Sequence, residues 1–246
     1  MKKYIFSIFN AFLLFCLMTN TGNALEQIGM PEAIGKNIVA EFRPEAAVIK
    51  VKNKTAWIEM TGGVIDGIRI EKMKLLAELE ETIVPNENGS ESSKSSLAKM
   101  IRSSKGEVVL AEKDVNDYFK KNENPDGFSN LQFDFTPAGF TATGNFITKI
   151  IIDLDLPIFA KGILGLHDNG VYLDKTSITV KGINQPDALT NLLLSKINPL
   201  LEFKDIPFPV AFEKIKMTEK AAVMTGEPRE FKGGVRWEWN KPQLSK

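Results

Sequence analysis

The residue types that carry out most enzyme chemistry are scarce in this chain of 246 residues. It contains one histidine, His167, within the turn-like segment Leu166-His167-Asp168-Asn169-Gly170. A catalytic triad or a metal site needs further partners beside a histidine, so we interpret His167 as a surface residue. The sequence has no G-x-S-x-G elbow, phosphate-binding loop or dinucleotide fingerprint. We therefore expect no enzyme, no cofactor and no metal site.

Two aspartates are the remaining candidates for acid–base or metal chemistry. Asp153 and Asp155 are two residues apart and so share one face of a predicted strand. Lys149 and Lys161 are close to them in the sequence, and carboxylates usually occupy solvated faces. We therefore interpret the pair, like the glutamates within residues 78–81, as a solvated charge cluster. A weaker alternative keeps the two aspartates as catalytic groups.

The N-terminus has the three parts of a secretory signal peptide. Lys2 and Lys3 precede an apolar segment over residues 4–18, and small polar residues follow as far as Ala24. The apolar segment is about 15 residues long, whereas a membrane-spanning helix needs roughly 20. We predict that residues 1–24 are a signal peptide cleaved after Ala24, and that the mature chain works in the periplasm or cell envelope space.

Cys16 is the only cysteine and lies inside that apolar segment. Phe15 precedes it, where a lipoprotein signal needs a small residue, so we expect no lipid-modified cysteine. The mature chain then has no disulfide or thiol ligand, and its stability depends on an apolar core. Loss of residues 1–24 removes two lysines from 31 basic and 31 acidic residues, which leaves a formal charge of −2. Nucleic acid is therefore not expected as a partner.

Short elements are predicted on both sides of a polar segment. A helix is expected over residues 30–42, where apolar positions repeat every four residues, and a strand over 46–52. Alternation over 64–83 changes parity near Glu71-Lys72, which indicates a bulge or a bend. Residues 86–96 are polar and low in complexity, so we predict a flexible insertion there. Next come a strand at 107–110 and a helix at 112–121.

Residues 131–156 carry the most regular alternation in the chain. Apolar residues occupy odd positions as far as a Pro-Ala-Gly turn, and over 140–156 they occupy even positions. We interpret 140–156 as one strand on the order of 55 Å long. Pro157 is expected to end it, and a return strand is predicted over 158–166. The opposite face is mostly polar, so that face of the sheet should be solvated.

The last third of the chain predicts a helix and a hairpin before a polar tail. The helix is expected from Pro186 to Asn198, and the hairpin over residues 210–225. In the tail, residues 227–246, Trp237 and Trp239 alternate with polar residues. Tryptophan is favoured at membrane interfaces, so both are membrane-contact candidates. The other interpretation is a terminal strand that packs on the sheet.

Together these elements predict an α+β fold, a long and strongly twisted antiparallel sheet wrapped around amphipathic helices. We expect one domain over residues 25–226. The apolar face of the sheet must be covered, either as a closed core or around a groove that accepts acyl chains. The lipid-contacting candidates are the apolar residues of the long strand and of the C-terminal helix: Phe140, Phe146, Ile150, Ile152, Leu154, Leu156, Leu189, Leu192, Leu193 and Ile197.

A series of Gly- and Pro-punctuated apolar segments runs through most of the chain. It comprises residues 62–70, Val109-Leu110-Ala111-Glu112-Lys113-Asp114-Val115-Asn116, the pair 144–146 and 162–164, then 180–186, 197–201, Ile206-Pro207-Phe208-Pro209-Val210 and 224–226. In these segments the chain resembles the LmeA-like family of bacterial exported phospholipid-binding proteins. The resemblance implies a tubular lipid-binding architecture and brings no catalytic residue with it. The segment 86–96 and the tail have no counterpart in the family pattern.

The resemblance implies a periplasmic or envelope protein that holds phospholipid acyl chains in an apolar groove, for lipid transport or envelope assembly. Each buried methylene of a lipid contributes about 0.8 kcal/mol, so binding needs no polar motif. Two alternatives stay open. One is a non-catalytic envelope scaffold or interaction protein with a closed core, and the weaker one is an envelope enzyme that acts on lipid or glycan.

Overall fold

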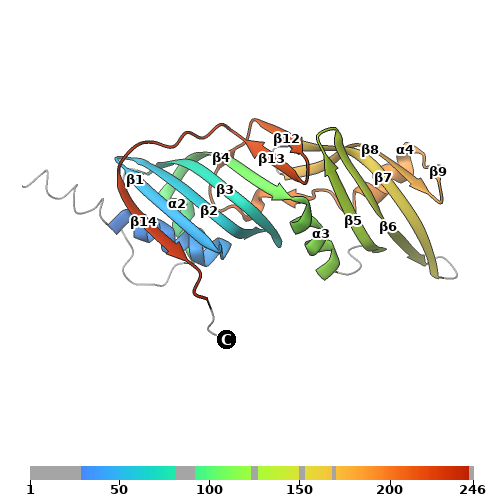
Figure 1. Ribbon diagram of the computed structural model, residues 1–246, viewed down its shortest axis with the longest axis horizontal. Coiled ribbons are helices and arrows are strands. Elements are labelled where there is room, and N and C mark those ends of the chain that lie inside the picture. The colour runs from blue at the N-terminus through green and yellow to red at the C-terminus, as the bar shows by residue number, and fades with distance from the viewer. Residues whose placement is uncertain (1–28, 81–91, 123–126, 150–152, 168–169, 244–246) are drawn as a thin grey trace, which may run out of the picture.

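Two antiparallel sheets lie one after the other along the long axis of the molecule (Figure 1). The computed structural model describes residues 29–80, 92–122, 127–149, 153–167 and 170–243. The predicted α+β class and the antiparallel pairing are confirmed, except that β11 runs parallel to β4. The strands form two twisted sheets rather than one. The predicted signal peptide lies outside the described residues.

Sheet A forms one half of the molecule and has the order β12-β13-β4-β3-β2-β1-β14, with β11 added beside β4. The C-terminal tail therefore supplies the edge strand β14, which pairs with β1. The strands are β1 (Ala46–Lys52), β2 (Thr55–Ile65), β3 (Ile68–Leu79), β4 (Ile101–Ala111), β11 (Val210–Ala211), β12 (Lys214–Thr218), β13 (Ala221–Thr225) and β14 (Val235–Asn240).

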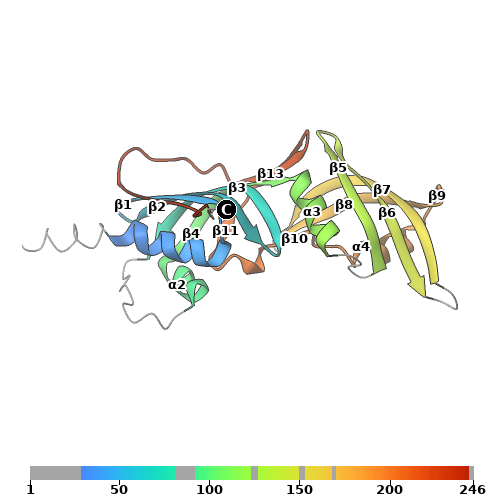
Figure 2. The ribbon, with the colours of Figure 1, turned by 60° about the horizontal axis from the view of Figure 1, so that its bottom comes forward.

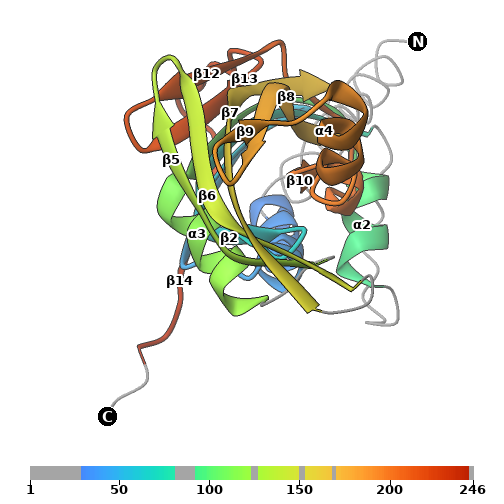
Figure 3. The same cartoon turned by 90° about the vertical axis from the view of Figure 1, so that its right-hand side faces the viewer.

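Sheet B forms the other half and has the order β10-β8-β7-β6-β5, with β9 beside β8. Its strands curve around one side of the long axis, and a short helix lies on the other side (Figure 3). The strands are β5 (Phe128–Thr136), β6 (Gly139–Lys149), β7 (Asp153–His167), β8 (Gly170–Val180), β9 (Ile183–Asn184) and β10 (Leu201–Glu202).

A helix over residues 29–42 lies along one face of sheet A (Figure 2), as the four-residue spacing predicted. Ile34, Ile38 and Phe42 on its apolar face are fully buried. The Phe42 ring meets the edge of Phe208, with 6.4 Å between the ring centroids. Phe208 follows the short 3-10 helix η2 (Phe203–Asp205), so the C-terminal third of the chain also covers this face.

A second helix, α2 (Ser93–Met100), covers sheet A beside the first (Figure 2). The side chain of Ser92 caps it by accepting a hydrogen bond from the Ser95 N–H. Leu97 and Met100 are buried against the sheet. The predicted flexible insertion over 86–96 is therefore wrong from Ser93 onward, because the serines cap a helix whose apolar anchors come later. Residues 81–91 lie outside the described part of the chain.

The parity change predicted near Glu71 in β3 is confirmed, and it is a bend rather than a bulge. The pairing of β2 with β3 keeps one register from Thr55 opposite Glu78 to Ile65 opposite Ile68. No residue is inserted. Gly62, which faces this point from β2, has a φ of +69°, a value that favours glycine. The left-handed Gly62 therefore lets the sheet turn without a loss of register.

The predicted single strand over 140–156 is wrong, because it is a hairpin. β6 and β7 pair from Phe140 opposite Gly162 to Lys149 opposite Asp153, so the chain reverses between the last two. Even-numbered residues lie opposite even-numbered residues throughout this register. One alternation pattern therefore passes through the reversal unchanged. Pro157 lies within β7 and does not end it. Because proline has no N–H to donate, the pairing of β7 with β8 begins only at the next residue, Ile158.

Helix α3 (Glu112–Lys121) connects the two sheets (Figure 1), over the residues predicted to be helical. Its apolar residues Val115 and Phe119 are buried, and the Phe119 ring lies 5.4 Å from that of Phe133 in β5. On its polar side, Glu112 accepts a hydrogen bond from the Phe135 N–H and forms an ion pair with Lys220. The helix thus contacts strands of both sheets.

No helix among the described residues is long and apolar enough to cross a membrane. The longest is the amphipathic helix over residues 29–42, whose apolar face is already used by sheet A. The segment that the sequence predicts to be the apolar part of a signal peptide, residues 4–18, lies outside the described part of the chain.

Candidate functional site

The two sheets differ in how completely their inner faces are covered. In sheet A, Ile49, Ile58 and Leu75 have no exposed surface at all. In sheet B, Ile158 and Ala160 retain 7% and 8% exposure. Because helices seal the inner positions of sheet A, that half of the molecule is a closed core. Sheet B also contains fully buried residues, among them Phe135 and Val171, but Phe146 and Leu156 on its inner face keep part of their surface exposed.

Exposure along sheet B rises toward the hairpin end of β6 and β7. Phe140 and Ala142, near the other end of β6, are 3% and 6% exposed. Phe146 and Leu156 lie opposite each other closer to the hairpin turn, and both are only partly buried. All four side chains are on the same face, because they occupy even positions of one register. The apolar face is therefore packed at one end and partly open at the other.

Phenylalanine rings line this face from its packed end toward the hairpin. The ring of Phe133 lies 5.8 Å from Phe140, and the ring of Phe128 lies 5.2 Å from Phe146. Phe119 of α3 joins the cluster through Phe133. Phe140, a predicted lipid-contacting residue, thus belongs to a packed core, whereas Phe146 lies at the margin of the cluster.

Helix α4 (Asp187–Leu194) covers only part of the inner face of sheet B. Eight helical residues span about 12 Å, whereas the eleven residues of β8 span about 36 Å. Thr190 and Leu193 are the buried residues of α4. A helix of two turns buries about one residue per turn, so it leaves the rest of the strand length uncovered.

The predicted inward stripe of this helix is only partly correct. Leu193 is buried and Ile197 is half-buried, as expected for residues that face the sheet. Leu189 and Leu192 are 38% and 58% exposed, so their predicted inward orientation is wrong. The predicted helix over 186–198 ends at Leu194, because the following turn directs Asn198 to the backbone of β8.

Other inner-face residues are absent from the sequence-based prediction. Ile158, Ala160 and Leu164 continue the even-numbered alternation along β7, and all three are buried. The alternation of these residues is visible in the sequence. They were missed because the sequence-based prediction ended the long strand at Pro157 and assigned them to a separate return strand. Of the predicted contacts, Ile150 and Ile152 lie outside the described residues, as does the side chain of Leu154.

The tryptophans of the tail lie far from this face, on β14 of sheet A (Figure 1). Trp237 packs against the helix over 29–42, where a Cβ placed on Gly35 would come within 2.1 Å of the indole ring. Trp239 is half-buried and lies opposite Ala47 of β1. The terminal-strand interpretation is confirmed. Membrane contact by the two tryptophans stays a prediction.

The titratable side chains described near sheet B form no arrangement typical of a catalytic site. The His167 Nε2 lies 2.9 Å from an Asp174 carboxylate oxygen, and its ring rests against Tyr172. Asp155 is exposed on the outer face. Within the described ranges, no three or more residues of the metal-ligand types come together.

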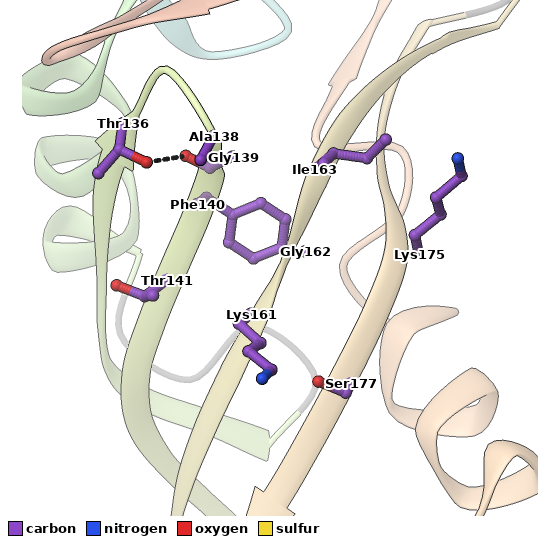
Figure 4. Close-up of a pocket in the computed structure, with 10 residues that line it drawn as sticks. All are labelled: Thr136, Ala138, Gly139, Phe140, Thr141, Lys161, Gly162, Ile163, Lys175 and Ser177. Carbon is purple, nitrogen blue, oxygen red and sulfur yellow. Dashed lines mark hydrogen bonds between the residues drawn. The ribbon is translucent and has the colours of Figure 1, made fainter.

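Surface hollows accompany the sheets in the described part of the chain. Figure 4 shows one of about 350 Å³ around the β5–β6 turn, where the Thr136 hydroxyl donates to the Gly139 carbonyl. Lys161 and Lys175 line it, but their side chains point in different directions and do not converge on one anion (Figure 4). A second hollow of about 540 Å³ separates β8 from α4 and is lined mainly by polar residues, including Asn191. The hollow between β8 and α4 is therefore too polar for an acyl chain.

The third hollow, of about 480 Å³, is more apolar and lies between β4 and the segment after β10. Phe203, Ile206 and Phe208 line it, and the buried Ser104 hydroxyl donates to the Pro209 carbonyl at its wall. It opens beside α2, where Lys94 pairs with Asp205 of η2. This hollow is separate from the inner face of sheet B.

Residues 56–227 match the family described as LmeA-like phospholipid-binding. The chain belongs to this phospholipid-binding family. The match extends from β2 to just beyond β13, so it includes all of sheet B and α4. Comparisons with curated proteins and with solved structures give no match. The resemblance stated from the sequence is thus confirmed, and the partly covered face of sheet B lies within the LmeA-like part of the chain.

Proposed function

We propose that this LmeA-like protein is a lipid carrier of the bacterial envelope. The acyl chains of a phospholipid lie against the inner face of sheet B, and the protein shields them during lipid transport or envelope assembly. Family membership supports a phospholipid ligand. The observation that carries the site is the half-buried pair of Phe146 and Leu156, at the open end of an otherwise buried apolar face.

The physical chemistry of this face suits an acyl chain. An acyl chain has no hydrogen-bonding groups, so it is stabilised by apolar surface alone, at about 0.8 kcal/mol per buried methylene. Phe146, Leu156 and Ile197 each keep part of their surface free for such contact. An apolar lining of this kind stays dry and accepts apolar guests.

The direct test is mass spectrometry of lipids that co-purify with the protein under native conditions. We expect phospholipid in the wild-type protein and its loss in Phe146→Glu, because a carboxylate on this face repels an acyl chain. Asp155→Asn is the matched control. Asp155 neighbours Leu156 on the same strand but faces solvent, so lipid occupancy should be unchanged. Equal lipid content in all three proteins would contradict the assignment of the face.

The scaffold alternative is favoured by one observation, the fully sealed core of sheet A. If that packing also extends over sheet B in solution, the wild-type protein will be purified without lipid. The location is tested separately, by sequencing the N-terminus of the protein after expression in a bacterial host. Export with cleavage after Ala24 gives Leu25 as the first residue.

A further inference from the structure

We infer that the end of the molecule formed by β9 and α4 docks on a membrane that contains anionic phospholipid. Three large apolar side chains project into solvent there: Ile183 of β9 is 70% exposed, Leu192 of α4 is 58% exposed and Leu189 is 38% exposed. The described residues include only two other exposed large apolar side chains, Val64 and Phe159. The exposed apolar surface is therefore concentrated at one end.

These three side chains belong to two consecutive elements, and we call them the tip patch. Only Gln185 and Pro186 separate β9 from α4 in the chain, and both elements lie at the same end of the molecule (Figure 1). Leu189 and Leu192 are three residues apart and so are neighbours on the helix surface. An apolar patch on the surface of a monomer commonly marks a site of interaction.

The charges around the tip patch favour an anionic surface as the occupant. Residues 174–200 contain three lysines, Lys175, Lys181 and Lys196, and two acids, Asp174 and Asp187. The lysines and Asp187 are exposed, whereas Asp174 is half-buried and contacts His167. Lysines at the border of an apolar patch bind anionic headgroups while the apolar side chains enter the interface. The excess of positive charge is local, because the whole chain has equal numbers of basic and acidic residues.

The tip patch also lies next to the open end of the inner face of sheet B. The Lys181 N–H donates to the Pro157 carbonyl at 3.2 Å, and Pro157 follows Leu156 in the chain. Val180, which precedes Lys181, lies opposite Ile158 on the inner face. A membrane bound at the tip patch is therefore close to the place where acyl chains enter or leave. The role of docking in lipid entry and exit rests on the proposed function, whereas the docking itself does not depend on it.

The test is co-sedimentation with vesicles of phosphatidylcholine alone and of phosphatidylcholine mixed with phosphatidylglycerol, using protein purified after export. Wild-type protein should bind the mixed vesicles more tightly, and less so at high salt. Replacing Ile183 and Leu192 by serine should weaken binding by roughly tenfold for each side chain. Lys181→Glu combined with Lys196→Glu should remove the preference for phosphatidylglycerol.

Two control variants match these changes on sheet A. Val64→Ser removes an apolar side chain as exposed as that of Leu189, and Lys216→Glu reverses an exposed lysine of β12. Neither should alter vesicle binding. Equal binding by the wild-type and tip-patch variants would overturn the inference, as would absence of wild-type binding or self-association through the patch. Co-purified lipid is measured on the same samples: tip-patch variants that keep lipid but lose vesicles separate docking from the carrier function.

Discussion

The side-chain amide of Asn116 forms two hydrogen bonds with the backbone of Phe133. Its Oδ1 accepts from the Phe133 N–H at 2.7 Å, and its Nδ2 donates to the Phe133 carbonyl at 2.9 Å. Asn198 makes the same pair of contacts with the backbone of Leu173. Phe133 is on the β5 edge of sheet B, and Leu173 is on the outer side of β8. One asparagine thus satisfies backbone groups on the β5 edge, beside the contact of Glu112 with Phe135, and the other does so on β8 between its pairings with β10 and β9.

Asn116→Ala should lower the free energy of unfolding by about 1–3 kcal/mol, because two half-buried backbone groups of Phe133 lose their partners. Urea denaturation followed by circular dichroism measures this change. Asn191→Ala is the control, since Asn191 is an exposed residue of α4, and its effect should stay within about 0.5 kcal/mol. A variant as stable as wild type would show that water replaces the amide.

Arg69 joins an exposed carboxylate to a buried one. Its guanidinium contacts both oxygens of Glu45 at 3.0 Å, and it lies 2.9 Å from Asp114, whose side chain is only 3% exposed. Arg69→Met should cost about 3 kcal/mol of stability, since it leaves a buried carboxylate unpaired. Glu45→Gln should cost less than about 1 kcal/mol, because that pair faces water. Thermal melts of both variants at neutral pH compare the two, and equal losses would contradict this ranking.

Acid should weaken the fold partly through Glu45. The hydrogen bond from Arg69 lowers the pKa of this carboxyl below its ordinary value of 4.5. A lowered pKa in the folded state contributes stability above the ordinary value, and this contribution is lost as the pH falls through the folded pKa. Unfolding free energies measured from pH 6 downward should therefore decline below about pH 4.5. Glu45→Gln should show a shallower decline, and an identical slope would count against the ion pair.

Asp66 should behave in the opposite way. Burial raises its pKa above the ordinary 3.8, although its carboxylate accepts a hydrogen bond from the Glu202 N–H. A raised carboxyl pKa means that the charge costs stability at neutral pH, and the cost disappears below both pKa values. Asp66→Asn should therefore be stabilising at about pH 7 and neutral at about pH 3. Asparagine also suits the φ of +50° at this position. A loss of stability at neutral pH would contradict the prediction.

Gly35→Ala should displace Trp237 from the helix over 29–42. The added Cβ would come within 2.1 Å of the indole ring, so the ring must move even though alanine favours a helix. Acrylamide quenching of Trp237, with Trp57 and Trp239 replaced by phenylalanine, should increase. Gly29→Ala is the control, because a Cβ at that position would meet no atom within 4 Å. Unchanged quenching in Gly35→Ala would mean that the ring is not seated there.

The sequence was sufficient to predict those helices and strands that are held in place by one apolar face. The four-residue spacing of Ile34, Ile38 and Phe42 predicted the first helix, and these residues are its buried face. Alternation also predicted which face of β6 is apolar. It could not reveal the reversal after Lys149, because the register of the hairpin keeps even positions on the same side of both strands.

Other features depend on contacts between distant segments, which periodicity does not encode. The asparagine contact between Asn116 and Phe133 joins a helix to a strand 17 residues away. The exposed positions of Leu189 and Leu192 follow from the way α4 packs, because its buried side is formed by Thr190 and Leu193. A leucine-rich helix predicts burial on average, so its exposed side becomes visible only in three dimensions.

Helix α3 has a consequence for how the protein unfolds. It packs on strands of sheet A through Val115, holds β5 of sheet B through Asn116, and meets Lys220 of the β12–β13 turn through Glu112. The two sheets cannot separate without breaking the contacts of that helix with at least one of them. The two halves should therefore melt in a single cooperative transition, with calorimetric and van't Hoff enthalpies that agree.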